Sequence, residues 1–338
     1  MSQFAGWLSS KYVVGRAPTA YEENADLGNF DSSGFTPVDR GIIRVDEACL
    51  EYVDRHFLYR GWAAMGGAVG SVLALIFGGA ILRSDLSDGA LDYGLVPFYL
   101  AIIAFLVFSY TFLISKDVLR HQYYPSLFNR EEGVVYFFTG RDDGYVKVPW
   151  GDIKFIIGRD KPFGPDEGMT YDLKALIMDG GKISHVFAIG SDCGSSPATV
   201  LAHWEMIRRF MEGGIGALPF PPLQLYTSTI DSFRNAFVIH VSSAGRGLMW
   251  IALPLTLPWA IFRYLVMKTC RRPVWPAAVA RQSPNTDSRV LRAPPVYGGV
   301  DRSHGKDDLL ASYWISSIQE ARSRDGEVKA QLCREGVP

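Results

Sequence analysis

Two uncharged apolar runs lie close together in the first third of the chain, and they constrain what the rest can fold into. The first, Trp62 to Leu82, reads WAAMGGAVGSVLALIFGGAIL, and the second, Leu95 to Ile114, reads LVPFYLAIIAFLVFSYTFLI. Each has about 20 residues, the number that an α-helix needs to cross a hydrocarbon core about 30 Å thick. The sequence therefore predicts an integral membrane protein with an α-helical transmembrane hairpin over residues 61–115.

Positive charges flank the predicted hairpin on its outer sides. Arg55 and Arg60 precede the first run, Lys116 and Arg120 follow the second, and the connecting loop contains Arg83. The positive-inside rule then places both outer flanks in the cytoplasm. We expect a multi-pass protein of a bacterial inner membrane, with the bulk of the chain on the cytoplasmic side and membrane lipids as direct partners.

Small residues recur at every fourth position of the first run. Gly66, Gly70, Ala74 and Gly78 form a stripe of the kind that lets another helix approach closely. We expect this helix-packing stripe to contact the second run of the same chain. The alternative is a seam between two copies, which the same stripe would serve.

Residues 1–60 are predicted to form an N-terminal cytoplasmic segment, because their first part lacks the continuous apolar core of a signal peptide. Gly, Asn, Asp, Ser and Pro concentrate between Ala25 and Pro37, a composition typical of a loop. From Gly41 onward GIIRV favours a strand, and apolar residues such as Leu50 and Phe57 then follow at helical spacing. We expect a helix there that leads into the membrane.

Residues 116–216 are predicted to form a cytoplasmic α+β domain, an antiparallel sheet with one C-terminal helix. Asp143-Gly144 and Asp179-Gly180 are dipeptides typical of tight hairpin turns, and alternating apolar runs flank both. The helix begins near Ser196, has Pro197 in its first turn and ends at a glycine pair. Strands are expected at 133–138, 145–150, 152–158, 170–179 and 182–190, with the third continuing the meander of the first two.

A third apolar run, Leu248 to Met267, contains Pro254, Pro258 and Arg263. Prolines inside a helix remove backbone donors and break the hydrogen-bond ladder. A transmembrane course would also place the two flanks of the run on opposite sides, against their charges. We therefore favour a re-entrant or interfacial helix pair over residues 248–267, bent at the LPLTLP segment, rather than a true third span.

The remaining segments are rich in proline. Residues 217–247 are a predicted connector, and residues 268–338 are a predicted cytoplasmic tail whose composition favours an extended strap. Within the tail, Leu310, Trp314 and Ile318 fall four apart and predict an amphipathic helix. We expect this helix to pack on its own chain, and a partner protein is the alternative.

Composition argues against two kinds of ligand. The formal net charge is −1, so the chain lacks the surplus of Lys and Arg that nucleic-acid binding requires. The four cysteines form no CxxC pair, and the six histidines form no HxH or HExxH spacing. We therefore predict no nucleic-acid partner, no metal site and no cofactor.

Cys193 is the candidate catalytic nucleophile. It lies in GSDCGSS just before a predicted helix, where the positive end of the helix dipole favours a thiolate, and His185 and His203 are the nearest histidines. The alternative is a Gly/Asp/Ser turn that happens to contain a cysteine. We favour the turn, because a nucleophile also needs a base and an oxyanion site.

A basic group lies at the end of the third apolar run. Arg263, Lys268, Arg271 and Arg272 could attract anionic headgroups at the membrane surface, with Arg263 reaching toward them, each cation contributing about 1 kcal/mol. The alternative is that these cations only fix the topology of the chain. The sequence favours both interpretations equally.

The chain also shows two resemblances to known proteins. The order of elements, with a transmembrane hairpin before the strands and VPWGDI at Val148–Ile153 opening one of them, resembles pleckstrin-homology-like domains of bacterial membrane proteins. Over roughly residues 60–280, the chain resembles a family of proteobacterial inner-membrane proteins without an assigned activity. The resemblance is carried by the hairpin, YYPSLFNREEGVVYFF at Tyr123–Phe138, the VPWGDI strand, the proline-containing third apolar run and RRPVWP at Arg271–Pro276. Their genes often lie beside those of type VI secretion effectors. The resemblance implies a role in interbacterial antagonism, as an immunity protein or accessory factor, and assigns no active-site residues.

We therefore expect a non-enzymatic, membrane-anchored module whose cytoplasmic domain binds another protein, such as a secreted effector or a secretion component. The alternative from a different class is a membrane enzyme that acts on lipid or another substrate through Cys193. A third hypothesis is a subunit that forms homo-oligomers through the small-residue stripe at Gly66, Gly70, Ala74 and Gly78.

Overall fold

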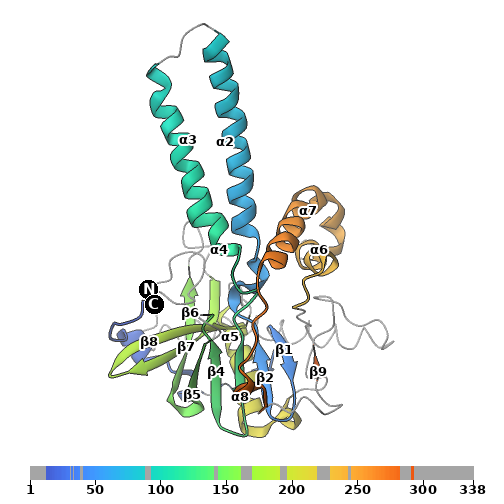
Figure 1. Cartoon of the computed structure of the whole chain (residues 1–338). Helices are drawn as coiled ribbons and strands as arrows, with labels where there is room; N and C mark the ends of the chain where they lie inside the picture. Colours follow the sequence, from blue (N-terminus) through green and yellow to red (C-terminus); the bar gives the residue numbers. More distant parts are fainter. Residues whose placement is uncertain are drawn as a thin grey trace. The chain divides into compact units, whose positions relative to one another are not determined.

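The chain divides into two compact units, each assembled from segments that are distant in sequence (Figure 1). The sheet unit comprises Met1–Leu58, Tyr123–Ile230 and Pro273–Pro338, and the helical unit comprises Tyr59–Gln122 and Asp231–Arg272. Within them, the computed structural model describes residues 13–30, 32, 34–38, 41–87, 93–140, 144–160, 170–190, 196–218, 229–242, 245–281 and 291–292.

Two antiparallel sheets build the sheet unit. The first has the strand order β5-β4-β3-β2-β1-β9 and the second has the order β6-β7-β8. The strands are β1 (Ile42–Val45), β2 (Cys49–Tyr52), β3 (Ser126–Asn129), β4 (Val134–Phe138), β5 (Tyr145–Pro149), β6 (Ile153–Asp160), β7 (Thr170–Asp179), β8 (Lys182–Ile189) and β9 (Leu291–Arg292). The short helices of this unit are α1 (Ala20–Asn24), η1 (Leu27–Asn29), η5 (Trp150–Asp152), η7 (Ile215–Ala217) and α8 (Ala277–Arg281).

The first sheet is continuous across the apolar hairpin in the sequence. β2 pairs with β3 in antiparallel register, Cys49 opposite Asn129 and Tyr52 opposite Ser126. The predicted boundary that separated residues 1–60 from the α+β domain is therefore wrong. So is the predicted helix through Leu50, because four buried residues in a row mark a buried strand, and so short an apolar run does not distinguish strand from helix.

Local pairings agree with the sequence. β4 and β5 form a hairpin with Phe138 opposite Tyr145, and β7 and β8 form the second hairpin with Asp179 opposite Lys182. One expectation is wrong: β6 does not continue the meander of β4 and β5 but pairs with β7 in the second sheet. The single turn η5, entered from Pro149, separates β5 from β6, and β6 joins the other sheet.

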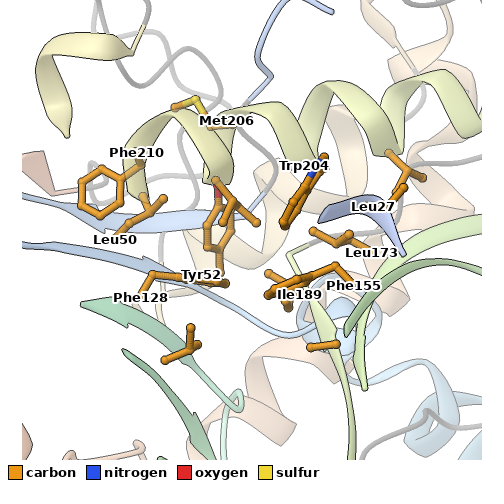
Figure 2. Close-up of a cluster of buried hydrophobic side chains, with 14 of the residues drawn as sticks. Leu27, Leu50, Tyr52, Phe128, Phe155, Leu173, Ile189, Trp204, Met206 and Phe210 are labelled. Atoms are coloured by element: carbon orange, nitrogen blue, oxygen red, sulfur yellow. The ribbon is translucent and has the colours of Figure 1, made fainter. Parts of the chain in front are cut away.

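Helix α5 (Pro197–Gly213) covers the core that both sheets share. Figure 2 shows Trp204 and Phe210 of this helix facing Tyr52 of the first sheet and Phe155 of the second. Trp204 is 2% exposed and Phe210 is fully buried. Phe137 of β4 also stacks on Phe187 of β8, with ring centroids 4.3 Å apart. The two sheets and the helix therefore bury one common apolar core, as the predicted α+β class requires.

Segments predicted as loop and strap also pack on this unit. Before β1, Val38 is fully buried and Ser32 donates a hydrogen bond of 2.6 Å to Glu205 on α5, so Ala25–Pro37 is not a free loop. After the helical unit, Trp275 donates to Glu51 at 2.8 Å and packs edge-on against Phe138. The described parts of both segments therefore pack on the sheets, and the amphipathic helix predicted at Leu310, Trp314 and Ile318 lies outside the described residues.

A cluster of buried charges sits on the second sheet. Asp172 of β7 is fully buried and accepts from Arg55 and from Lys174, each at 2.9 Å. Arg55 also donates to Thr170 at 2.7 Å. Burial alone would raise the pKa of the Asp172 carboxyl, but the cations of Lys174 and Arg55 hold it below its ordinary value. The ion pair therefore persists to low pH, and its stabilisation is lost only as the pH falls through this lowered pKa.

Gly158 of β6 makes room for this cluster. It lies directly opposite Asp172 in the β6–β7 register, and a Cβ atom there would lie 2.2 Å from both Asp172 Oδ1 and Lys174 Cε. Both side chains are enclosed and cannot swing into solvent, because their exposed fractions are 0% and 1%.

We expect Gly158→Ala to lower the free energy of unfolding by about 2–4 kcal/mol, because the methyl group overpacks the sheet and displaces a buried ion pair. Denaturant unfolding of the full chain in mild detergent, followed by tryptophan fluorescence, measures the change. Gly151→Ala is the matched control, since a Cβ there meets nothing within 4 Å. Equal unfolding midpoints for the two variants would contradict the role assigned to Gly158.

Candidate membrane-anchoring site

Two long helices of the helical unit expose large apolar side chains on all sides. They are α2 (Trp62–Ser87) and α3 (Val96–Phe108), preceded by the short helices η2 (Arg55–Tyr59) and η3 (Tyr93–Leu95), respectively. Phe77 is 64% exposed, Leu100 60% and Tyr110, in the π-helical turn after α3, 68%. Counted over Arg55–Ser87 and Val96–Asp117, these helices are long and apolar enough to cross a membrane. Neither has the single apolar stripe of a helix that lies on a soluble core.

Small residues of α2 face α3. A Cβ at Gly70 would lie 2.9 Å from the Phe105 ring, and one at Gly78 would lie 2.6 Å from Ile102. Ala74 lies between them and is half-buried. These three members of the predicted stripe therefore share the face on which the two helices of one chain pack.

Gly66 does not belong to that face. It is exposed and a Cβ there would meet nothing within 4 Å, whereas one at Gly67 would lie 3.0 Å from Leu113 Cβ and 3.3 Å from Ser109 O. The reason is geometric. Eleven residues separate Gly67 from Gly78, about three turns of 3.6 residues, whereas a strict spacing of four drifts around the helix.

The helix that begins with α3 changes from α-helical to π-helical hydrogen bonding at the residues that face Gly67. Ser109–Ile114 (η4) is a π-helical turn, followed by α4 (Ser115–Asp117). The Thr111 hydroxyl donates to the carbonyl of Val107 at 2.7 Å, and the Ser115 hydroxyl donates to that of Thr111. Polar side chains thus bond to backbone carbonyls within the turn itself, which is how a helix in an apolar medium satisfies its polar groups.

Asp117 closes the base of the hairpin. Its Oδ2 atom accepts from the backbone amides of Gly61, Ala63 and Ala64 at 3.1–3.2 Å, and its Oδ1 atom lies 3.9 Å from Arg60 Nη1. Amides at the start of a helix have no partner within the helix, and the helix dipole there favours a negative charge. One carboxylate at the end of the second helix therefore caps the first.

The chain that follows α7 (Gly245–Thr269) is joined to the same base. The Cys270 thiol donates to the carbonyl of Asp117 at 3.1 Å, and the Gln122 side chain donates to that of Met267 at 3.0 Å. At the start of α2, Gly61 has a φ of +93°, and a Cβ there would lie 2.7 Å from the Arg263 backbone. Only glycine suits both the conformation and the close approach.

Helix α7 corrects two expectations about the third apolar run. Pro254 and Pro258 lie inside one helix and do not end it, so the expected bend at LPLTLP does not divide the run. The helix that packs against α7 is α6 (Phe233–Ser242), which precedes it in the chain. Arg263 is 1% exposed and therefore does not reach a surface, because α7 packs on the first turn of α2, where Trp62 stacks on Trp259.

The other three predicted surface cations are exposed. Lys268 and Arg272 both pair with Asp231, at 3.1 and 2.6 Å, and their side chains are 50% and 62% exposed. Arg271 is also exposed. Two neighbouring cations hold the pKa of the Asp231 carboxyl below its ordinary value, although partial burial alone would raise it.

The catalytic candidate Cys193 lies outside the described residues, so the enzyme hypothesis keeps its status as a prediction. Of its two neighbouring histidines, His203 is fully buried against Tyr52, with ring centroids 5.0 Å apart, and His185 stacks on Phe187. Burial lowers the pKa of His185. Among the described residues, no three His, Cys, Asp or Glu side chains gather as metal ligands.

Two polar arrangements, the clasp at Asp117 and the cluster at Asp172, were not predicted from the sequence. The second has a signal there, because Asp172 and Lys174 occupy alternate positions of an otherwise apolar strand and so face the same side. The first has no such signal, because the amides that Asp117 accepts lie more than 50 residues earlier in the chain.

A protein-family model matches more than half of the chain. Residues 102–287 match DUF6708, a family of unknown function. The chain belongs to this family. The DUF6708 match starts inside α3 and extends past α8, so it includes β3 to α5 and also α7 but neither β2 nor α2. No curated protein and no solved structure matches the chain.

Gly66 and Gly67 are adjacent in α2, so substitutions at these two positions test which face of the helix packs against the second helix. We expect Gly67→Val to lower the free energy of unfolding in bicelles by about 2 kcal/mol, because the new side chain meets Leu113 and backbone at Ser109. Gly66→Val introduces the same side chain where it meets no neighbour, and should change the free energy of unfolding by less than about 0.5 kcal/mol. Denaturation by SDS, followed by circular dichroism, measures both. A larger effect at Gly66 would refute the assigned face.

Proposed function

We propose that α2 and α3 anchor this protein in a membrane and that the sheet unit binds another protein. The exposed apolar surface of the two helices carries this proposal. Burying one large apolar side chain is worth about 1.5–3 kcal/mol, and net domain stabilities are only about 5–15 kcal/mol. A surface with Phe77, Leu100, Tyr110 and their neighbours open to water would therefore be untenable without cover.

Lipid suits this surface better than a protein partner. A partner helix covers one side of a helix, whereas the consecutive exposed residues Leu75, Ile76 and Phe77 of α2 point to three different sides, each turned about 100° from the one before. The two helices also have the length that a bilayer requires. A transmembrane hairpin accounts for both features at once.

The charges support the orientation. Lys116, Arg120 and Arg271 are exposed at the base of the hairpin, and Arg83 is the cation near its other end. By the positive-inside rule the base faces the cytoplasm of a bacterial cell, with the protein in its inner membrane. The contacts described between α7 and the start of α2 involve Gly61, Trp62 and Ala64, at or next to the first turn of α2, which favours an interfacial position for α7 over a third span.

The sheet unit supports the binding role. The first antiparallel sheet has the order β5-β4-β3-β2-β1-β9, β6 to β8 form the second, and α5 follows them and covers their common core. Two sheets closed by a helix support the proposal of a pleckstrin-homology-like domain, in which β1 and β9 would be additions to the first sheet, and loops on such a rigid scaffold commonly carry binding residues. We propose that the partner is an effector or component of a type VI secretion system and that the protein acts as an immunity or accessory factor.

Topology is the first test. Tags inserted after Asp88, Gly180 and Val300 should separate into two groups in intact spheroplasts. We expect externally added protease to cut only the tag after Asp88, because the base of the hairpin carries the cations. Cleavage at Gly180 without lysis would overturn the orientation, and recovery of the whole chain in the soluble fraction would overturn the membrane anchor.

Partner binding is the second test. We expect affinity purification in mild detergent to recover one protein in stoichiometric amount, and co-expression to protect cells from an effector encoded beside the gene. The matched control lacks residues 60–121 and retains β2 and β3 on a short linker. If binding belongs to the sheet unit, this control should still bind the partner in vitro but should fail to protect cells. Recovery of the protein with itself alone would favour an oligomeric role instead.

A further inference from the structure

Five exposed cations gather at the base of the hairpin, and we call them the basic collar: Lys116, Arg120, Lys268, Arg271 and Arg272. All five belong to the helical unit. Lys116 lies in the last turn before the hairpin ends, Arg120 follows it, and the other three lie at or just past the end of α7. The collar therefore lies where the second candidate span, Val96–Asp117, reaches its end.

Backbone contacts hold the two halves of the collar together. The Arg271 amide donates to the carbonyl of Arg120 at 2.8 Å, and the Gln122 amide donates to the carbonyl of Arg271 at 2.8 Å. His121 and Arg271 form a parallel bridge between these two segments. The main chain thus holds the segments that carry Arg120 and Arg271 side by side.

The collar keeps a surplus of positive charge. Asp231 pairs with Lys268 and Arg272, and both cations remain at least half exposed. Arg120 donates to a neutral backbone carbonyl, that of Ser115, at 3.3 Å. Asp117, the other carboxylate of this region, is 3% exposed and is directed toward the amides of α2. In the described part of the helical unit, the exposed cations of the collar therefore outnumber the partly exposed carboxylate of Asp231.

An apolar residue lies among these cations in a strained conformation. Leu119 has a φ of +58° and is the one residue other than glycine with a positive φ in the described part of the chain. It is also 78% exposed. In water, both the positive φ and the exposure of an apolar side chain are unfavourable for a leucine. Both properties make sense if its side chain enters the acyl region beside the last turn of the span.

We propose that the basic collar, together with Leu119, is a binding site for the phosphate headgroups of anionic lipids. This inference rests on the proposed membrane anchor and specifies the lipid class that it selects. A guanidinium group can bind phosphate oxygens through two parallel hydrogen bonds. The collar contains three such groups, those of Arg120, Arg271 and Arg272. The leucine then lies at the level of the glycerol and upper acyl chains of the same lipid.

A role confined to topology explains less. The positive-inside rule needs only the presence of cations in the flank, whatever their arrangement. It does not require Arg120 and Arg271 to lie on two segments joined by backbone hydrogen bonds. Nor does it require an exposed leucine in the left-handed conformation, such as Leu119, beside them. A headgroup site requires both the convergence of cations and an apolar contact.

The test uses the full chain reconstituted in phosphatidylcholine vesicles that contain spin-labelled phosphatidylglycerol or spin-labelled phosphatidylcholine. Electron spin resonance gives the association constant of each label at the protein surface. We expect phosphatidylglycerol to be favoured, and each cation removed in Arg120→Gln and Arg271→Gln to lower this preference about fivefold, equivalent to ~1 kcal/mol per cation near a membrane surface. The preference should also fall as salt is raised.

Three controls make the outcome decisive. Arg83→Gln removes one cation from the other end of α2 and should leave the preference unchanged. The double variant Arg120→Lys with Arg271→Lys keeps the charge and should retain most of the preference. Wild-type protein that floats with vesicles but shows no preference overturns the headgroup site alone. Protein that fails to float with any vesicle overturns the membrane anchor as well.

Discussion

The pairing of β2 with β3 is the constraint on which the rest of the structure depends. Residues 53–125 lie between these two adjacent strands, so the apolar hairpin must leave the sheet and return to it at the neighbouring strand. If α2 and α3 cross a membrane, as we propose, two crossings satisfy that requirement, whereas a single span would not. The antiparallel register from Cys49–Asn129 to Tyr52–Ser126 thus makes a two-helix insert the natural solution, since it returns the chain to the side from which it left.

In each of the two units, one buried carboxylate connects segments that are distant in sequence, and the two carboxylates do so by different interactions. Asp117 has no strong ion pair, since Arg60 is 3.9 Å away, and it works by accepting three backbone amides at the start of α2. Asp172 is paired with two cations inside a sheet. In each case a single buried acceptor connects segments that are distant in sequence. Removing either would leave donors or cations without compensation, which costs more than the bond itself contributes.

Local signals made half of this architecture predictable. Alternating residues around Asp-Gly turns gave both hairpins, and Ser196-Pro197 with its glycine stop gave α5. The pairing of β2 with β3 has no local signal, because its partners lie on opposite sides of the apolar hairpin and neither short strand alternates. For the candidate site, Gly70 and Gly78 followed from spacing, whereas the burial of Arg263 and the intact helix at Pro254 depend on packing against Gly61 and Trp62. Such contacts leave no mark in the sequence of either partner.

The interrupted first sheet also has a consequence for how the protein is made. The ribosome releases β1 and β2 first and, under the proposed membrane anchor, then delivers the two apolar helices α2 and α3 to the insertion machinery before β3 emerges. At roughly 5–20 residues per second, the nascent N-terminal ribbon waits several seconds for its neighbour. During that interval the edge of β2 that later pairs with β3 has no partner, and side chains of β2 that are buried in the folded protein remain exposed to water. Under the proposed membrane anchor, completion of the first sheet would therefore wait for insertion of α2 and α3, and a chain whose helices stall would keep the unpaired edge of β2 exposed.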